Sequence, residues 1–269
     1  MKTAVLASDL DGTLIPLERT AETRSALRSF GLHCGKSACS LIYVTGRHLS
    51  LALDGVVAFE LPQPETIIAD VGTTIWRKAS DQRWELDQGY AELLRQHWNG
   101  REATDIGAIL DSLPELRLQP DDRQGRFKRS YFVDLDVMQD ALAEDVRAAL
   151  ENANTEAQLI CSVDPVKQVA LLDVLPPQAS KLSALEHLCN TKSIARETLV
   201  YAGDSGNDLQ VFESGIRSVL VANTPADVIA RSRTTASTHG RSACIYIATQ
   251  KYTAGVIEGC QHFGLFEAD

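Results

Sequence analysis

The sequence lacks long hydrophobic runs and the cysteine patterns of metal sites. None of its apolar stretches approaches the 18 or more residues of a transmembrane helix, and Asp9 and Asp11 interrupt the first one. We therefore expect no membrane span, no export signal and a cytoplasmic protein. The six cysteines form no CxxC pair and no Cys/His cluster with zinc spacing, so we expect reduced thiols.

Positive charge is also in short supply, because 26 basic residues stand against 36 acidic ones and give a formal net charge of −10. This balance argues against a nucleic-acid-binding protein and against a polybasic membrane binder. The sequence has no internal repeat. Its 269 residues, 44% hydrophobic and 23% charged, are typical of a globular protein with one large or two modest domains.

Short apolar strands alternate with helical patterns in both terminal parts of the chain, which is typical of βαβ units and a parallel sheet. The expected strands are 3–8, 41–44, 66–69, 198–202 and 218–222, and the expected helices are 19–32 and 208–213. The middle of the chain is more charged and has its own elements. These are helices at 90–98 and 138–152 and strands at 131–134 and 168–173. The sequence therefore predicts an α/β domain with a smaller α+β insertion.

Four polar segments each follow a predicted strand. They are Asp9-Leu10-Asp11-Gly12-Thr13, Thr45-Gly46-Arg47, Lys181, and Gly203-Asp204-Ser205-Gly206-Asn207-Asp208. Ligands of open parallel sheets bind outside the carboxyl ends of the strands, so we expect these segments to meet at one site.

The residue types in these segments favour phosphoryl transfer. Carboxylates crowded together repel one another unless a cation or a proton intervenes, and oxygen ligands of this kind suit Mg²⁺. A carboxylate can attack a phosphoryl group, and a second carboxyl group can protonate the leaving alcohol and later deprotonate water. A threonine hydroxyl, backbone N–H groups and a lysine would hold the phosphate oxygens.

Each segment alone has an ordinary structural interpretation as a turn, a helix cap or a surface lysine. A calcium loop that began at Asp9 would need Glu at its twelfth position, where Thr20 stands. The four segments in this order, each after a strand, favour a single catalytic site.

Together the four segments resemble the signature motifs of the haloacid dehalogenase superfamily of phosphohydrolases. The resemblance implies that Asp9 is the nucleophile and that Asp11 is the general acid/base, whose backbone carbonyl also binds Mg²⁺. The remaining implied roles are phosphate binding by Thr45, Gly46, Lys181 and Asn207 and metal binding by Asp9, Asp204 and Asp208. A carboxylate at Asp11 is typical of the phosphatases and phosphomutases of that superfamily.

The spacing of the motifs locates the insertion. Only 31 residues separate Thr13 from Thr45, whereas about 130 separate Arg47 from Lys181, far more than a crossover between strands needs. We therefore expect a Rossmann-like core at 1–77 and 174–269 and an α+β cap at 78–173. A cap in this position resembles the superfamily's phosphatases more than its sugar phosphomutases.

A closer resemblance, to the sucrose-phosphatase family, covers nearly the whole chain. It is carried by 70–73, 127–131, 172–176, 203–208, 221–223 and 252–264. Thr74 stands where that family often has an acidic residue. The resemblance implies Mg²⁺-dependent hydrolysis of a disaccharide phosphate, first of all sucrose 6-phosphate. Mannosylfructose phosphate, a broader range of sugar phosphates, or a silent partner of a sugar-phosphate synthase remain alternatives.

The sugar would lie between the cap and the core. We expect it to contact Arg47, Asp70, Thr73, Arg126, Lys128 and Ser130. The expected partners are a small sugar phosphate and a sugar-phosphate synthase, with no nucleic acid and no membrane, and the expected state is a monomer.

Overall fold

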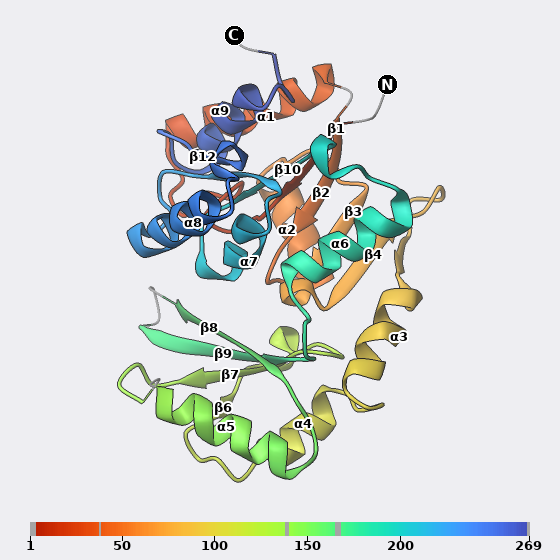
Figure 1. Cartoon of the computed structure of the whole chain (residues 1–269). Coiled ribbons are helices and arrows are strands. Elements are labelled where there is room, and N and C mark those ends of the chain that lie inside the picture. The colour runs from red at the N-terminus through yellow and green to blue at the C-terminus, as the bar shows by residue number, and fades with distance from the viewer. Residues whose placement is uncertain (1–3, 38, 138–139, 165–167, 268–269) are drawn as a thin grey trace.

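The computed structural model describes residues 4–37, 39–137, 140–164 and 168–267 as two sheets with helices packed on both (Figure 1). The larger sheet has the order β12-β11-β10-β1-β2-β3-β4-β5. Its strands are β1 (Ala4–Ser8), β2 (Cys39–Val44), β3 (Thr66–Ala69), β4 (Thr74–Lys78), β5 (Trp84–Leu86), β10 (Leu199–Gly203), β11 (Arg217–Leu220) and β12 (Ile245–Ile247). From β12 to β3 the strands run parallel, and β4 and β5 add an antiparallel edge.

Helices cover both faces of the larger sheet, and alternate strand residues divide between two cores. Leu6 packs in one core with Phe30 and Val256, whereas Val5 and Ala7 face the other core. The first face is covered by α1 (Ala21–Lys36), α2 (Leu49–Ala58) and α9 (Tyr252–His262). The second is covered by α6 (Lys181–Lys192), α7 (Leu209–Glu213) and α8 (Ala226–Thr238). This three-layer arrangement confirms the predicted α/β fold.

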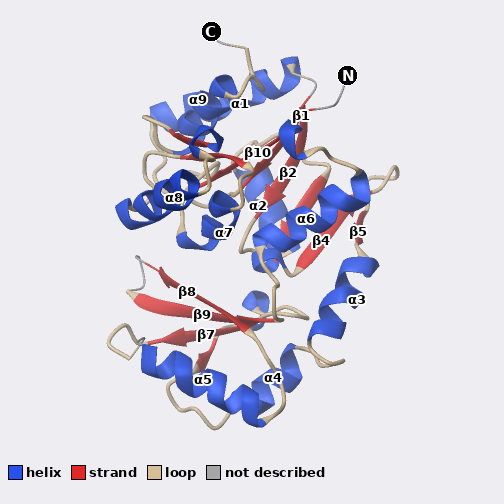
Figure 2. Cartoon of the chain, viewed as in Figure 1, coloured by secondary structure: helices blue, strands red, loops and turns tan. Residues whose placement is uncertain are grey.

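The smaller sheet is antiparallel and lies between the larger sheet's end and two helices of its own (Figure 2). Its order is β6-β7-β9-β8, with strands β6 (Arg117–Leu118), β7 (Arg129–Val133), β8 (Gln158–Asp164) and β9 (Val169–Leu175). The two helices on the far side of this sheet are α4 (Ala103–Leu110) and α5 (Asp140–Asn152), and α3 (Gln88–His97) connects β5 to this part of the chain. Tyr131 and Leu172 pack with these helices, so the opposite face of the sheet is turned to the larger domain.

The two sheets divide the chain slightly differently from the predicted boundaries. Residues 84–86 form β5 of the larger sheet, although the sequence assigned 78–173 to the cap. β9 continues to Leu175 in the smaller sheet. The division into a 1–77 and 174–269 core and a cap stays a prediction. The six cysteines are free thiols in the structure.

Candidate active site

The first motif and the fourth motif meet at the carboxyl end of the larger sheet. Ser8, the last residue of β1, is in register with Tyr43 of β2 and Ala202 of β10. Asp9 follows directly and donates its backbone N–H to the Ala202 carbonyl at 2.9 Å. Thr45 follows β2 in the same way. The sheet register therefore delivers these side chains to one edge.

Lys181 lies at the centre of the site. It is the first residue of α6, its side chain is buried, and its ammonium donates to Asp9 Oδ1 at 2.9 Å and to Asp208 Oδ1 at 2.7 Å. Burial by itself would lower the pKa of Lys181, but Asp208 and Asp9 outweigh it and raise the pKa above its ordinary value. Lys181 therefore stays charged at neutral pH.

Both oxygens of Asp208 are engaged by the protein. The Tyr201 hydroxyl and Lys181 donate to Oδ1, and the backbone N–H groups of Asp204 and Ser205 donate to Oδ2 at 3.1 and 3.0 Å. Asp208 is completely buried. Its carboxylate thus fixes the position of Lys181 and the shape of the 203–208 loop.

Asp204 is held against the first motif. Thr13 donates to its Oδ1 at 2.9 Å, and Asn223 lies 3.4 Å from its Oδ2. Gly12 has φ +77°, and a Cβ at this position would lie 2.3 Å from Asp204 Oδ2. Only glycine permits both this backbone conformation and this approach. Burial, and then the neighbouring Asp208, raises the pKa of Asp204 to about 7.

The acidic cluster fits a divalent cation. Asp9, Asp204 and Asp208 each offer an oxygen atom, and these atoms lie within 4.8 Å of one another. Three carboxylates and the Lys181 ammonium carry a formal charge of −2, which one divalent ion would balance. Burial raises the pKa of Asp9 well above its usual range, against the opposing charge of Lys181. Because Asp208 is fully engaged, Asp9 and Asp204 are the side chains free to face an ion.

Asp11 is not part of this carboxylate cluster and pairs with Arg47. The guanidinium donates from Nε to Asp11 Oδ2 at 2.8 Å and from Nη2 to Oδ1 at 2.5 Å. Arg47 also donates to the Leu51 carbonyl of α2 at 3.0 Å, and Gly55 leaves room for the guanidinium. The Asp11 side chain is 47% exposed. The sequence predicted that Arg47 contacts the sugar, but in the structure it forms an ion pair with Asp11, the predicted general acid/base.

The other predicted phosphate-binding residues border the same edge. Thr45 is buried, and its hydroxyl oxygen accepts the Arg47 backbone N–H at 3.2 Å. Gly46 stands between them. The side-chain Oδ1 of Asn207 accepts a hydrogen bond from the Ser205 hydroxyl at 3.0 Å.

A second polar cluster joins the two sheets. Lys128 Nζ lies 4.0 Å from Asp70 Oδ1, and both side chains are at most 7% exposed. Asp70 has φ +52°, and among the described residues its Oδ1 meets no hydrogen-bond donor, whereas Thr74 donates to Oδ2 at 3.1 Å. Burial raises the pKa of Asp70, against the charge of Lys128. Thr73 donates to the Asp70 carbonyl at 2.9 Å.

The last two predicted sugar residues differ in position. Ser130 donates to Asp173 Oδ1 at 2.5 Å, across the β7–β9 pair and close to Lys128. Arg126 instead pairs with Glu102 at 2.7 Å and lies over the Phe127 ring. The structure thus brings Asp70, Thr73, Lys128 and Ser130 together and leaves the Arg126 guanidinium outside the cluster.

Sequence reasoning missed four residues of these clusters. Thr13 ends the first motif, and Asn223 lies in the 221–223 segment that resembles the sucrose-phosphatase family. A small polar side chain beside a glycine or at the end of a strand is the sequence signal that could have identified them as site residues. Tyr201 lies inside a buried strand and is typical of core packing. Asp173 lies within β9, where it is in register with Ser130.

Within the part of the chain that the structure describes, no helix is long and apolar enough to cross a membrane. The sequence profile of the sucrose-6F-phosphate phosphohydrolase family matches residues 2–264. The chain is 33% identical over 267 residues to a putative HAD-like hydrolase of Nitrosococcus oceani, with 96% of this chain and 71% of that protein covered. It is 31% identical to the mannosylfructose-phosphate phosphatase of Agrobacterium fabrum, with 97% of each covered.

The fold is similar to that of a solved protein. The sucrose-phosphatase of Synechocystis, solved in complex with sucrose and phosphate, superposes with a TM-score of 0.78 at 24% identity over the full length of both chains.

Proposed function

The chain belongs to the sucrose-6F-phosphate phosphohydrolase family and is a phosphoric monoester hydrolase, and from this premise we propose that it hydrolyses a disaccharide phosphate, first of all sucrose 6-phosphate. The resemblance to sucrose phosphatases of the haloacid dehalogenase superfamily is thereby confirmed. The observation that carries the proposed chemistry is the buried contact of Lys181 with Asp9.

In the proposed mechanism, Asp9 attacks the phosphorus atom and the bond between phosphorus and the sugar oxygen breaks. Asp11 gives a proton to that oxygen and later takes one from the attacking water, which releases phosphate and frees Asp9. Arg47 donates to both oxygens of Asp11, and one of these hydrogen bonds would open when Asp11 carries the proton. Lys181 and Thr45 would bind the phosphate oxygens as negative charge shifts between them.

Mg²⁺ is the proposed cofactor, held by Asp9 and Asp204 and by the Asp11 carbonyl that the resemblance implies. When bound, it would neutralise charge between the phosphate dianion and Asp9. Neighbouring residues would keep the metal ligands in position. Gly12 and Thr13 orient Asp204, and Asp208 fixes the conformation of the 203–208 loop.

The proposed sugar site is the cluster between the two sheets. Asp70 Oδ1 is a buried acceptor without a donor among the described residues, and sugar hydroxyls are donors. Lys128, Ser130 and Asp173 add a cation and further hydrogen-bonding groups on the face of the smaller sheet turned to the core. The smaller sheet and its helices would thus form the cap that recognises the sugar and excludes water.

A second candidate substrate is mannosylfructose phosphate. It is favoured by the similarity to the mannosylfructose-phosphate phosphatase of Agrobacterium fabrum, which covers 97% of both chains. Both candidates are disaccharide phosphates, so the site proposed above serves either one. A synthase partner and a monomeric state stay predictions.

The test is phosphate release from sucrose 6-phosphate, mannosylfructose phosphate, fructose 6-phosphate and p-nitrophenyl phosphate. We expect kcat/KM for a disaccharide phosphate at least about tenfold above that for fructose 6-phosphate, which corresponds to ~1.4 kcal/mol. Lys128→Met should narrow this ratio while p-nitrophenyl phosphate turnover persists. Arg126→Ala is the matched control, because its guanidinium pairs with Glu102, and it should leave the ratio unchanged. Equal efficiency on mono- and disaccharide phosphates would refute the disaccharide assignment.

A further inference from the structure

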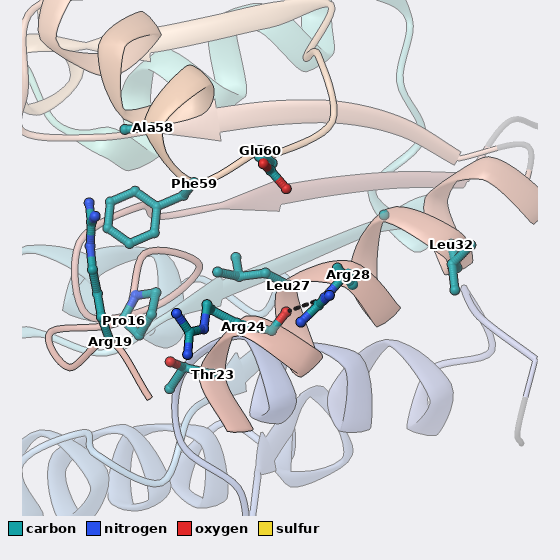
Figure 3. A pocket seen from close by; sticks show the side chains of 11 residues that line it. Pro16, Arg19, Thr23, Arg24, Leu27, Arg28, Leu32, Ala58, Phe59 and Glu60 are labelled. Carbon is teal, nitrogen blue, oxygen red and sulfur yellow. Dashed lines mark hydrogen bonds between the residues drawn. The ribbon is translucent and has the colours of Figure 1, made fainter. Parts of the chain in front are cut away.

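A pocket lies on the outer side of the larger domain, between the loop that follows the first motif, helix α1 and the end of α2 (Figure 3). Its volume is about 500 Å³, within the usual range for small-molecule sites. Pro16, Leu27 and Phe59 give it an apolar floor, and Leu32, 66% exposed, extends the apolar surface at one end. None of the residues proposed above for catalysis or sugar binding lines it.

Three arginines border this pocket. Arg24 and Arg28 project from α1, and Arg19 precedes the helix with its guanidinium 4.5 Å from the centre of the Phe59 ring. Within the described part of the chain, none of the three forms an ion pair with a carboxylate. Among the residues that the structure describes, Arg28 donates to the Arg24 carbonyl alone, at 3.4 Å.

The arginine cluster stands out against the charge of the whole chain. The formal net charge is −10, yet the lining residues hold three arginines and a single acid, Glu60. Gathering unpaired guanidinium groups costs mutual repulsion that a bound anion would remove. Arginine also binds phosphate through two parallel hydrogen bonds and stacks on aromatic faces.

From this combination we propose that the pocket binds a small aromatic anion of the nucleotide class. Arg24 and Arg28 would hold the phosphate groups, and the base would lie on the apolar floor beside Arg19 and Phe59. The proposal concerns a site separate from the catalytic one and goes beyond the proposed function, on which it does not depend.

Binding is tested by calorimetry with ADP and UDP as probes, in EDTA and in a buffer without phosphate, which would compete for the arginines. Inorganic pyrophosphate and free adenosine are measured in parallel. We expect the wild-type protein to bind a nucleoside diphosphate at least about tenfold more tightly than pyrophosphate or adenosine. Pyrophosphate lacks the aromatic base, and adenosine lacks the phosphate groups.

Two pairs of variants locate the site. Arg24→Glu with Arg28→Glu should weaken nucleotide binding at least about tenfold, whereas Arg233→Glu, an exposed arginine of α8, should leave it unchanged. Gly31→Leu would fill the pocket without a change of charge and should also weaken binding. Its control is Gly35→Leu in the same helix, outside the pocket; an added Cβ meets no described atom within 4 Å at either glycine.

Absence of nucleotide binding by the wild-type protein would overturn the proposal. Equal weakening by the pocket variants and their controls would also overturn it, because the probe would then bind elsewhere. Equally tight binding of pyrophosphate would show that the pocket recognises only the phosphate groups, and it would contradict the proposed binding of an aromatic base. A change of oligomeric state in the pocket variants, with nucleotide affinity unchanged, would show that this face contacts protein instead.

Discussion

Lys181 and Asp208 form a completely buried ion pair, with the ammonium 2.7 Å from the carboxylate. The pair joins the start of α6 to the loop after β10, two segments that also carry the predicted phosphate and metal sites. Asp208 is therefore the residue that holds the lysine where it can reach Asp9.

Replacement of this lysine should cost both stability and activity. Lys181→Met leaves two buried carboxylates without their cation, so we expect the free energy of unfolding to fall by about 3–5 kcal/mol and turnover to be lost. Urea unfolding and phosphate release measure the two effects. Lys192→Met, at the exposed end of the same helix, is the matched control and should change neither. A stable and active Lys181→Met protein would contradict this role.

Arg47 should act through Asp11. Loss of the two hydrogen bonds in Arg47→Ala frees the predicted general acid to rotate, which should lower kcat by a factor of about 10². The loss should be larger for an alkyl phosphate than for p-nitrophenyl phosphate, because p-nitrophenolate leaves without a proton. A variant changed only in KM for the sugar substrate would instead return Arg47 to the sugar site expected from the sequence.

Gly12 should be intolerant of a side chain. In Gly12→Ala the methyl group collides with Asp204 Oδ2 and the residue keeps a left-handed backbone, at a cost of about 1–3 kcal/mol. We expect the Mg²⁺ concentration for half-maximal activity to rise at least about tenfold, because Asp204 must move. Gly206→Ala is the control, since its Cβ would meet no described atom within 4 Å. Equal Mg²⁺ requirements in the two variants would argue against Asp204 as a ligand.

The raised pKa of Asp204, about 7, predicts a pH-dependent stability. The folded chain keeps this proton up to about pH 7, whereas the unfolded chain loses it near 3.8, so the folded state binds more protons between these values. The free energy of unfolding of the metal-free protein should therefore fall as pH rises from about 4 to 7. Mg²⁺ must displace the proton and should stabilise the protein more at pH 8 than at pH 6.

Thermal unfolding in EDTA and in Mg²⁺ across this pH range measures both effects. Asp204→Asn is the comparison, because it removes the titrating group, and its stability should depend less on pH. An identical slope in Asp204→Asn and the wild-type protein would show that another group is responsible.

The sequence predicted the parts of the fold that follow from local pattern. Apolar runs that end in Asp or Gly located β1, β2, β3 and β10, because buried parallel strands are continuous in hydrophobicity. β8 was missed, since Gln158, Ser162 and Asp164 interrupt its apolar pattern. β5 was assigned to the cap because its pairing with β4 is a tertiary contact that the spacing of motifs does not record.

In the candidate site, too, local sequence pattern predicted some features, whereas others depend on tertiary contacts. The motifs predicted which residues meet, because parallel strands deliver their ends to one edge. They did not predict that Arg47 would turn to Asp11 or that Arg126 would turn to Glu102, because each guanidinium could reach several carboxylates at the end of a long flexible stem. Tyr201 was missed because a buried tyrosine in a strand is usually part of a core.

The most direct test of the account is the rate of phosphate release from sucrose 6-phosphate by the wild-type protein and by Asp9→Asn in saturating Mg²⁺. The amide keeps the shape of the side chain but removes its charge and nucleophilicity, so we expect kcat to fall by a factor of at least about 10³ while the melting temperature changes little. Hydrolysis by Asp9→Asn at a rate near that of the wild-type protein would contradict the account.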